Sequence, residues 1–252
     1  MAARARVPVS ADTRPTIVFL HGTRLTGASW ATQVAVLGDR FHCLAPDLPG
    51  HGDAQAVAFS VDGAADRIAA LIEREAHGGR AIVVGLSLGG YVAMALAARR
   101  PDLVAGLAIS GATADPVGVR ELGYRGLAAV FRIVPERFLD RVNLWFFGWR
   151  FPADVSGPIV ADGFSFRGGA AAIHVLVGQR FKARLAAYPG PSLLVNGEYD
   201  FFFRPTERSF AAVAADPRRA LIRGAGHLAN LDRPEAFSAA IRRFANRIPP
   251  PA

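Results

Sequence analysis

Cysteine and lysine are almost absent from this sequence, which holds one of each, Cys43 and Lys182. A single cysteine cannot form a disulfide within the chain, so a disulfide-stapled scaffold is excluded. Cys43 lies in the apolar run FHCLAP, which predicts a buried structural thiol. Also missing are a run of about 18 apolar residues, as a membrane helix needs, and a signal-peptide-like apolar stretch near the N-terminus. The sequence therefore predicts a cytoplasmic protein with no membrane span.

Acidic residues are also in the minority, because 29 lysines and arginines stand against 21 aspartates and glutamates. The resulting sequence pI is near 10.8. A nucleic-acid-binding face would need these cations gathered in a run or a stripe, whereas the longest runs are pairs such as Arg99-Arg100, Arg218-Arg219 and Arg242-Arg243. This pattern argues against a nucleic-acid partner and leaves attraction of anionic substrates as a secondary effect.

Short apolar runs alternate with longer segments of helical period along the 252 residues. This alternation is typical of a parallel sheet covered by helices, and the continuous apolar character of the runs predicts strands buried on both faces. We therefore predict an α/β fold with a doubly wound, mostly parallel sheet. The predicted strands are 16–20, 41–46, 81–86, 104–110, 192–197 and 220–224. The predicted helices are 28–38, 62–76, 88–99, 206–215 and 233–247. In the last helix, we expect Asp232 as the capping residue and Pro234 in the first turn.

One long interval, from about residue 113 to 188, shows no strand pattern. Its segment 127–151 is rich in aromatic residues and resembles a helix that ends before Pro152. An insertion of this size between two strands predicts a helical cap over one edge of the sheet. We expect core segments at 1–112 and 189–252, with the cap at 113–188.

Ser87 lies in the pattern Gly85-Leu86-Ser87-Leu88-Gly89, between the predicted strand 81–86 and the predicted helix 88–99. This is the context of a nucleophile elbow, in which a strained turn exposes a serine hydroxyl at the start of a helix. Glycines at the flanking positions would avoid collisions with the neighbouring strand and helix. A five-residue pattern with three defined letters also occurs by chance, so other residues must decide whether Ser87 is a catalytic nucleophile.

A serine nucleophile needs a histidine base that is itself held by a carboxylate. His227 follows the last predicted strand and precedes the last helix, so it belongs at the same sheet edge as Ser87. Asp200 follows the strand 192–197 and lies between the two in sequence, as the order serine, acid, histidine requires. Glu198 and Asp115 are the competing candidates for the acid.

Acyl transfer also needs two backbone N–H groups aimed at the developing oxyanion. We predict that Leu88, the residue after Ser87, supplies one and that Thr23, in the loop after the first strand, supplies the other. Gly22 would let that loop come close to the site. We expect His21 to brace the loop, His51 to be a turn residue, and His174 to lie in the cap without a catalytic role.

Five segments, VFLHGT, APDLPGHG, VVGLSLGG, LLVNGEYD and RGAGHLANLDRPEAF, together resemble the α/β-hydrolase family, from about residue 15 to the C-terminus. The resemblance implies Ser87 as nucleophile, Asp200 as acid, His227 as base, and Thr23 and Leu88 as oxyanion donors. The family usually opens with an antiparallel hairpin, which would be shortened or absent here.

The resemblance does not by itself choose a reaction. We predict a serine carboxylic-ester hydrolase for a small or medium, largely apolar ester. One alternative is a carbon–carbon bond hydrolase of a dienoate, in which Arg150 or another cap arginine would hold a carboxylate. A second is a lactonase, thioesterase or acyltransferase of the same fold. A third, of another class, is a ligand-binding pseudoenzyme or receptor. We expect no metal or organic cofactor, and a monomer or homodimer.

Aromatic residues of the cap and of the loop after Asp200 are candidates for the substrate pocket. Many of them could equally pack the cap against the core, the commoner fate of helical aromatics. The predicted pocket residues are Arg24, Trp145, Phe146, Trp149, Phe201 and Leu228.

Overall fold

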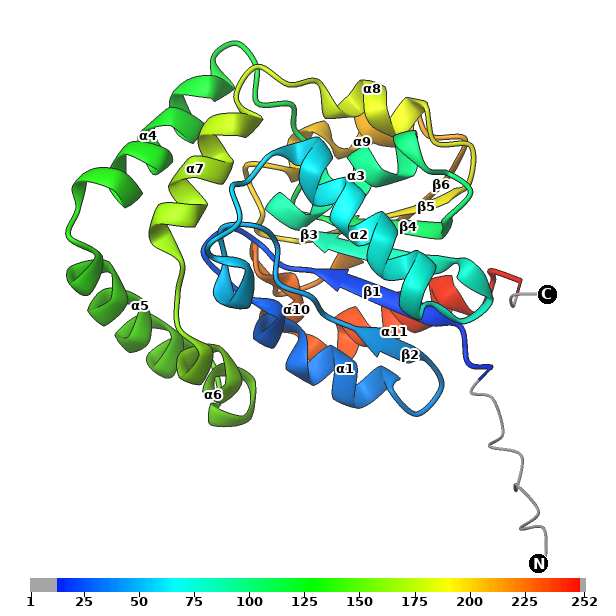
Figure 1. The fold of residues 1–252 in the computed structure, drawn as a ribbon, viewed down its shortest axis with the longest axis horizontal. Coiled ribbons are helices and arrows are strands. Elements are labelled where there is room, and N and C mark those ends of the chain that lie inside the picture. Colours follow the sequence, from blue (N-terminus) through cyan, green and yellow to red (C-terminus); the bar gives the residue numbers. More distant parts are fainter. Residues whose placement is uncertain (1–12, 250–252) are drawn as a thin grey trace, which may run out of the picture.

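A single six-stranded sheet forms the centre of the computed structural model, which describes residues 13–249 (Figure 1). The strand order is β2-β1-β3-β4-β5-β6, and within the described residues every pairing is parallel. The predicted α/β fold is confirmed. The strands are β1 Thr16–Leu20, β2 His42–Leu44, β3 Ala81–Leu86, β4 Val104–Ser110, β5 Pro191–Gly197 and β6 Asp216–Ile222.

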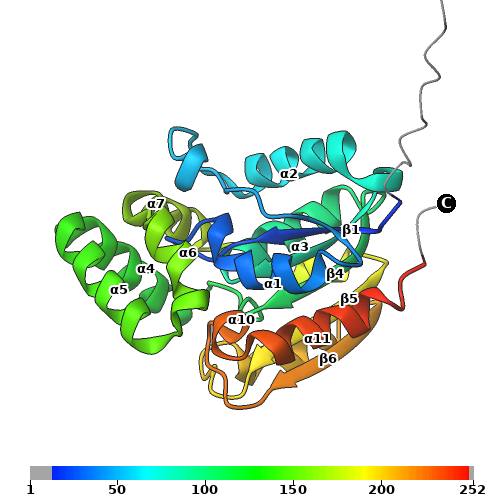
Figure 2. The same cartoon turned by 90° about the horizontal axis from the view of Figure 1, so that it is seen from below.

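Helices cover both faces of this sheet (Figure 2). Helices α2, α3 and α8 pack on one face, and α1 and α11 pack on the other. The core and loop helices are α1 Ala31–Leu37, α2 Val61–Glu75, α3 Leu88–Arg99, α8 Phe181–Ala186, α9 Glu207–Ala211, α10 Ala229–Asp232 and α11 Pro234–Ala245, with 3₁₀ turns η1 Gly27–Trp30, η2 Gly52–Ala54, η3 His77–Gly79 and η4 Arg204–Thr206.

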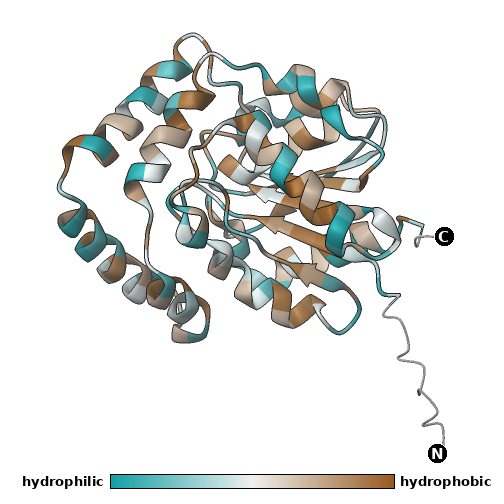
Figure 3. Cartoon of the chain, in the orientation of Figure 1, coloured by the Kyte–Doolittle hydropathy of each residue, from teal (hydrophilic) through white to brown (hydrophobic). Residues whose placement is uncertain are grey.

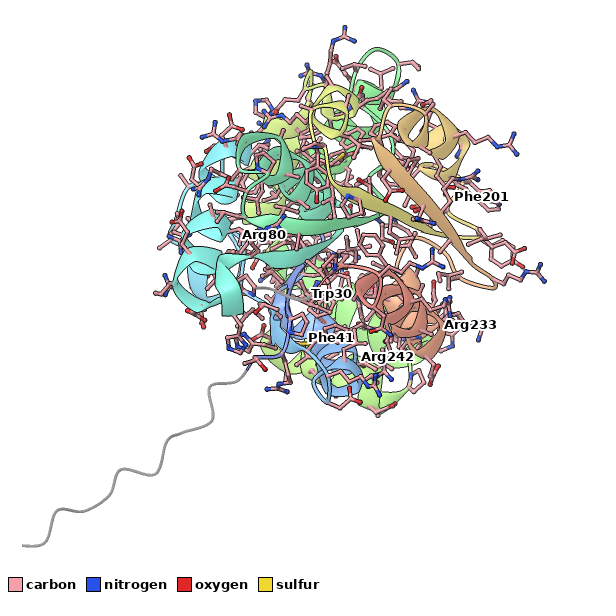
Figure 4. All side chains as sticks on the ribbon, turned by 90° about the vertical axis from the view of Figure 1, so that its right-hand side faces the viewer. Trp30, Phe41, Arg80, Phe201, Arg233 and Arg242 are labelled. Carbon is pink, nitrogen blue, oxygen red and sulfur yellow. The ribbon has the colours of Figure 1, made fainter. Side chains whose placement is uncertain are left out.

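The central strands are apolar without interruption because each face of the sheet has its own core. Val83 of β3 belongs to the cluster under α2 and α3, whereas Ile82 and Val84 belong to the cluster under α1 and α11. Trp30 and Phe41 are part of the second cluster, and Figure 4 labels both beside α1. Figure 3 shows the hydrophobic colour concentrated on the strands in the middle of the fold. Burial on both faces is the reason that no polar alternation is visible in the sequence.

The prediction of full burial is wrong for the two outer strands. Strand β6 begins at Asp216, earlier than predicted, and all of its residues except Ala220 and Ile222 are exposed because it lies at the edge of the sheet. Strand β2 lies at the opposite edge and is half-buried, including Cys43. The thiol is therefore less enclosed than expected, although burial still raises the pKa of Cys43 to about 11.

The start of α11 differs from its prediction. Pro234 occupies the first turn, as expected, but the capping position is Arg233, whose side chain makes no capping hydrogen bond. Asp232 instead accepts a hydrogen bond from the N–H of Gly226, at 2.7 Å, and pairs with Arg150. The carboxylate is thus used to hold the loop before α11 rather than the helix itself.

Four of the five helices between β4 and β5 lie beside the carboxyl ends of the strands (Figure 1). They are α4 Arg120–Ile133, α5 Glu136–Arg150, α6 Ala153–Asp162 and α7 Phe166–Leu176. The segment 127–151 is therefore not one helix, because Val134 is extended in front of Pro135. Proline disfavours helical backbone in the residue before it and cannot donate to the helix ladder.

The division into core segments 1–112 and 189–252 and a cap at 113–188 stays a prediction. Helix α8 falls within the proposed cap range, yet its Phe181 packs against Tyr91 of α3, with ring centroids 4.3 Å apart. Between residues 13 and 249, no helix is long and apolar enough to cross a membrane.

His21 braces the turn that follows β1. It is fully buried, its Nε2 accepts a hydrogen bond from the N–H of Leu48 at 2.9 Å, and its Nδ1 lies 2.9 Å from the carbonyl oxygen of Gly22. Burial, with a smaller contribution from neighbouring His51, lowers the pKa of His21 to about 3. The imidazole is therefore neutral at physiological pH and fixes the loop that carries Thr23 and Arg24.

This buried histidine predicts a loss of stability in acid. Between pH 6.5 and about 3 the unfolded chain binds a proton at residue 21 that the folded protein does not, so the stability is lost as the pH falls through this window. From pH 7 to pH 5, His21 alone should lower the free energy of unfolding by about 2 kcal/mol. Urea unfolding at the two pH values measures it. A His21→Asn variant should show a correspondingly weaker pH dependence, and an unchanged dependence would contradict the assignment.

Candidate active site

Ser87 occupies the turn between β3 and α3 with strained backbone. Its φ is 53° and its ψ is −113°, a left-handed conformation that non-glycine residues rarely adopt. The turn is held by a hydrogen bond from the N–H of Ser87 to the carbonyl oxygen of Ser110, at 2.8 Å. Within the described residues the Ser87 hydroxyl makes no hydrogen bond to the protein, and Ser87 lines the cavity beside it.

The glycines on either side of Ser87 are required by close backbone approaches. A Cβ atom on Gly85 would overlap the carbonyl oxygen of Gly89, and one on Gly89 would overlap the carbonyl oxygen of Leu20. On Gly90 it would overlap the side chain of Ala112. Helix α3 can therefore start directly over the end of β1 only because these positions lack side chains.

Asp200 and His227 meet although 27 residues separate them. Nδ1 of His227 lies 2.9 Å from Oδ2 of Asp200, whose side chain is buried, while that of His227 is 39% exposed. The N–H of Phe203 also donates to Asp200, through Oδ1 at 3.3 Å. Because Asp200 occupies Nδ1, the other ring nitrogen of His227 is left for the cavity, which Ser87 also lines.

The two competing carboxylates are engaged elsewhere. Glu198 accepts a hydrogen bond from the N–H of Gly224, at 2.9 Å. Asp115 accepts hydrogen bonds from the N–H groups of Phe181 and Lys182, at 2.7 and 2.9 Å, and so caps α8. Of the three candidates left open by the sequence, only Asp200 contacts His227.

Two residues that support His227 were not found from the sequence. The ring of Phe203 stacks on the imidazole, with centroids 5.1 Å apart and planes inclined by 19°. Gly111 has a φ of 57° and packs so closely that a Cβ atom there would overlap the imidazole. The FFF run after Asp200 hinted at aromatic packing, but nothing in the sequence brings Gly111 to this loop.

Thr23 and Leu88, the predicted oxyanion donors, both line the cavity next to Ser87. Leu88 is the first residue of α3, where N–H groups have no partner within the helix. Among residues 13–249 neither the N–H of Thr23 nor that of Leu88 has a protein acceptor. Both groups are thus available to an anion, and their role as oxyanion donors stays a prediction.

The cavity has a volume of about 490 Å³ and lies between the cap and the loop after β5. Arg24 and Phe201, two of the predicted pocket residues, line this cavity, and their contact with a substrate stays a prediction. Of the remaining wall residues, Phe202 and Phe203 were candidates as aromatic residues of the loop after Asp200, and the others were not predicted. The remaining wall is mostly apolar or aromatic and comes from α3, α4, α7 and the loop after β5. These residues are Tyr91, Gly123, Tyr124, Leu127, Ile173, Leu176, Tyr199, Phe202 and Phe203.

Trp145 and Trp149 do not line the cavity, contrary to the prediction. They are 66% and 71% exposed and stack on each other, with ring centroids 5.8 Å apart. The inward side of α5 is taken by Phe147, which is fully buried. A residue two places away is turned by about 200° on a helix, so both tryptophans face away from the core.

Phe146 and Leu228 are also absent from the cavity wall. Both are half-buried and pack against the apolar cluster formed by Phe147 and its neighbours on α6 and α10. His174 faces a separate hollow of about 640 Å³ between α4 and α7, away from Ser87. Arg150 pairs with Asp232 at the base of the cap and does not reach the cavity.

A metal site is not evident in the described part of the chain, where no three His, Cys, Asp or Glu side chains are grouped to hold an ion. The sequence prediction that no cofactor is needed stays a prediction.

The family sequence model described as "Alpha/beta hydrolase family" matches residues 17–240 of this chain. A pimeloyl-[acyl-carrier protein] methyl ester esterase of Methylococcus capsulatus is 37% identical over 117 residues, which are 46% of this chain and 43% of the relative. The matched segment thus spans less than half of that relative's length.

Solved structures resemble nearly the whole chain. A thermophilic esterase from Thermogutta terrifontis, with malate bound, is 26% identical with a TM-score of 0.77, covering 94% of this chain and 91% of its own. An E-2-(acetamidomethylene)succinate hydrolase is 25% identical with a TM-score of 0.78, covering 92% and 91%.

The close packing at the turn predicts opposite effects for two glycine substitutions. Gly89→Ala should lower the free energy of unfolding by about 1–3 kcal/mol, because the new methyl group meets backbone of β1 that cannot move aside. Gly126→Ala is the matched control in α4, where nothing lies within 4 Å of the added Cβ atom, and it should raise stability by about 0.5–1 kcal/mol. Chemical denaturation measures both, and equal effects would refute the packing argument.

Proposed function

This chain belongs to the alpha/beta hydrolase family, and on that premise we propose that it is a serine hydrolase of a small or medium, largely apolar carboxylic ester. Ser87 is the nucleophile, His227 the general base, and Asp200 the carboxylate that orients and stabilises the imidazole. The N–H groups of Thr23 and Leu88 form the oxyanion hole.

The reaction follows from these roles. Ser87 Oγ attacks the ester carbonyl carbon while its proton passes to the free ring nitrogen of His227. The negative charge that develops on the carbonyl oxygen is stabilised by the two N–H groups and by the N-terminal end of α3. His227 then protonates the departing alcohol oxygen, which leaves an acyl group on Ser87. A water molecule, deprotonated by His227, releases the acid and restores the serine.

The observation that carries this proposal is the 2.9 Å contact between His227 Nδ1 and Asp200 Oδ2 in the wall of the cavity that the strained Ser87 also lines. Strained non-glycine backbone persists where the surrounding structure enforces it, and it is concentrated at functional sites. The esterase relatives support the same class of reaction.

The cavity supports a substrate of modest size. About 490 Å³ accommodates a small-molecule ligand, and a wall of tyrosines, phenylalanines and aliphatic side chains favours apolar groups. Lactone, thioester and acyl-transfer chemistry would use the same residues and remain alternatives. Carbon–carbon cleavage through Arg150 is disfavoured, because that arginine is paired with Asp232 outside the cavity.

Loss of the nucleophile tests the proposal. On p-nitrophenyl esters of graded acyl length, Ser87→Ala should lower kcat at least about a thousandfold. Asp200→Asn should also lower kcat strongly, because the amide carries no negative charge and its NH2 group can donate to Nδ1, which favours the wrong His227 tautomer. The variants should keep the wild-type unfolding midpoint within a few degrees.

Ser60→Ala is the matched control, since Ser60 caps α2 and lies outside the cavity. It should leave kcat/KM within about twofold of wild type. Ester turnover that survives Ser87→Ala would disprove the mechanism. A wild-type protein that turns over no ester but cleaves a coloured dienoate, or only binds ligands, would point to the carbon–carbon hydrolase or the receptor.

A further inference from the structure

Arg24 shares an uncommon backbone conformation with the proposed nucleophile. Among the described non-glycine residues, only Arg24, with a φ of 58°, and Ser87, with a φ of 53°, lie in the left-handed region. Both residues line the same cavity. A long charged side chain gains nothing locally from this conformation, so the surrounding contacts must enforce it.

Those contacts come from three separate segments. The N–H of Arg24 donates to Nε2 of His51 at 3.2 Å, and its carbonyl oxygen accepts from the N–H of Ser165, in front of α7, at 2.9 Å. The side chain donates through Nε to Oδ1 of Asn143 on α5, at 3.0 Å. The amide nitrogen of Asn143 donates to the carbonyl oxygen of Leu139 at 2.8 Å, so the oxygen of this amide is the atom turned toward Arg24. The guanidinium is therefore held at Nε, and among residues 13–249 its two terminal nitrogens have no protein acceptor.

The charge of Arg24 has no counter-ion in the described part of the protein. No carboxylate lies within 4.0 Å of its guanidinium, and the one acidic residue in the cavity wall, Asp200, is engaged by His227. Burial alone lowers the pKa of Arg24 to about 10, with no opposing contribution from a neighbouring carboxylate. By contrast, Arg184 pairs with Asp62 and Arg219 with Glu207.

Arg24 donates to Asn143 and its guanidinium lies over the Phe131 ring, 6.0 Å from the ring centroid, but neither partner carries a negative charge. A largely enclosed cation without a counter-ion is unfavourable unless an anion is supplied from outside. The site has one positive charge, a planar fork of donors and apolar walls. This arrangement suits a single planar carboxylate, which two parallel N–H donors bind in a bidentate manner, better than it suits a dianionic phosphate.

We propose that the natural substrate is an ester that carries a free carboxylate, and that the terminal nitrogens of Arg24 bind this carboxylate inside the cavity. The inference rests on the proposed esterase function and names its substrate class. Arg24 is then the residue that selects anionic over neutral esters, and Asn143 positions its guanidinium.

Paired substrates test the selectivity. The monomethyl esters of dicarboxylic acids with three to six carbons are compared with methyl ester amides of the same length, in which a neutral carboxamide replaces the free carboxylate and the methyl ester is kept. For the best chain length, the wild-type kcat/KM should favour the carboxylated ester by roughly 10- to 100-fold, the range expected for charge-assisted hydrogen bonds. Arg24→Gln should bring this ratio close to one, and Arg24→Lys should give an intermediate value because it keeps the charge but loses the fork.

Arg137→Gln provides the matched control. Arg137 is an exposed arginine of α5 outside the cavity wall, so its loss changes the net charge of the protein equally and should leave the ratio unchanged. A ratio that falls to the same extent in both variants would show general charge attraction and overturn the assignment of Arg24. A wild-type ratio near one at every chain length would also overturn it, while leaving the proposed esterase function intact.

Binding without turnover separates this inference from the proposed function. Glutarate and adipate are titrated into the Ser87→Ala protein by calorimetry, with glutaramide as the neutral comparison. If Arg24→Gln is added to the Ser87→Ala protein, the dissociation constants of the dicarboxylates should increase at least about tenfold. This result supports the carboxylate site even if no ester is cleaved. Asn143→Asp tests the same site and leaves the strained residue Arg24 unchanged. It supplies Arg24 with an internal carboxylate, so it should weaken dicarboxylate binding similarly. Unchanged binding in both variants would refute the proposal.

Discussion

The close approach of α3 to the end of β1 is the constraint on which the rest of the site depends. Gly89 lies against the carbonyl oxygen of Leu20, and Gly85 against that of Gly89, so the chain reverses from strand to helix at Ser87 alone. This reversal strains the backbone of Ser87 but turns its hydroxyl toward the cavity, and it places the N–H of Leu88 at the open end of a helix. Burial of β3 on both faces stabilises the turn, because neither β3 nor α3 can shift without disrupting an apolar core.

Polar contacts join the inserted helices to the core around this turn. The hydroxyl groups of Tyr91, on α3, and Tyr124, on α4, lie 2.5 Å apart in the cavity wall. Arg150, at the end of α5, pairs with Asp232, which also holds the N–H of Gly226 beside His227. The position of α4 and α5 is therefore linked to the two segments that carry Ser87 and His227. Hydrogen bonds and ion pairs depend on geometry more strongly than apolar packing does, so they define how the cap sits over the cavity.

Regular periodicity and local turn chemistry explain which parts of the fold were predictable. The strands and helices around Ser87 follow from continuous apolar runs and glycines, and Asp200 and His227 follow from their places after strands. Prediction failed where a neighbour far along the chain decides the outcome. Trp145 and Trp149 share a helix with Phe147, but only the packing of α5 shows which side faces inward. The exposure of β6 likewise reflects its place at the edge of the sheet, which its residues do not specify.

The sequence by itself determined the order of strands and helices, the strained serine turn, and the residues that could form a catalytic set, because each depends on residues close together in the chain. Only the tertiary structure decided which carboxylate meets His227, which aromatic residues form the cavity wall, and that Arg24 has no counter-ion within the described residues. These features depend on contacts between residues that are far apart in sequence, such as Arg24 with Asn143, 119 residues apart. No local pattern encodes such a contact, since it exists only after the sheet and the inserted helices have packed together.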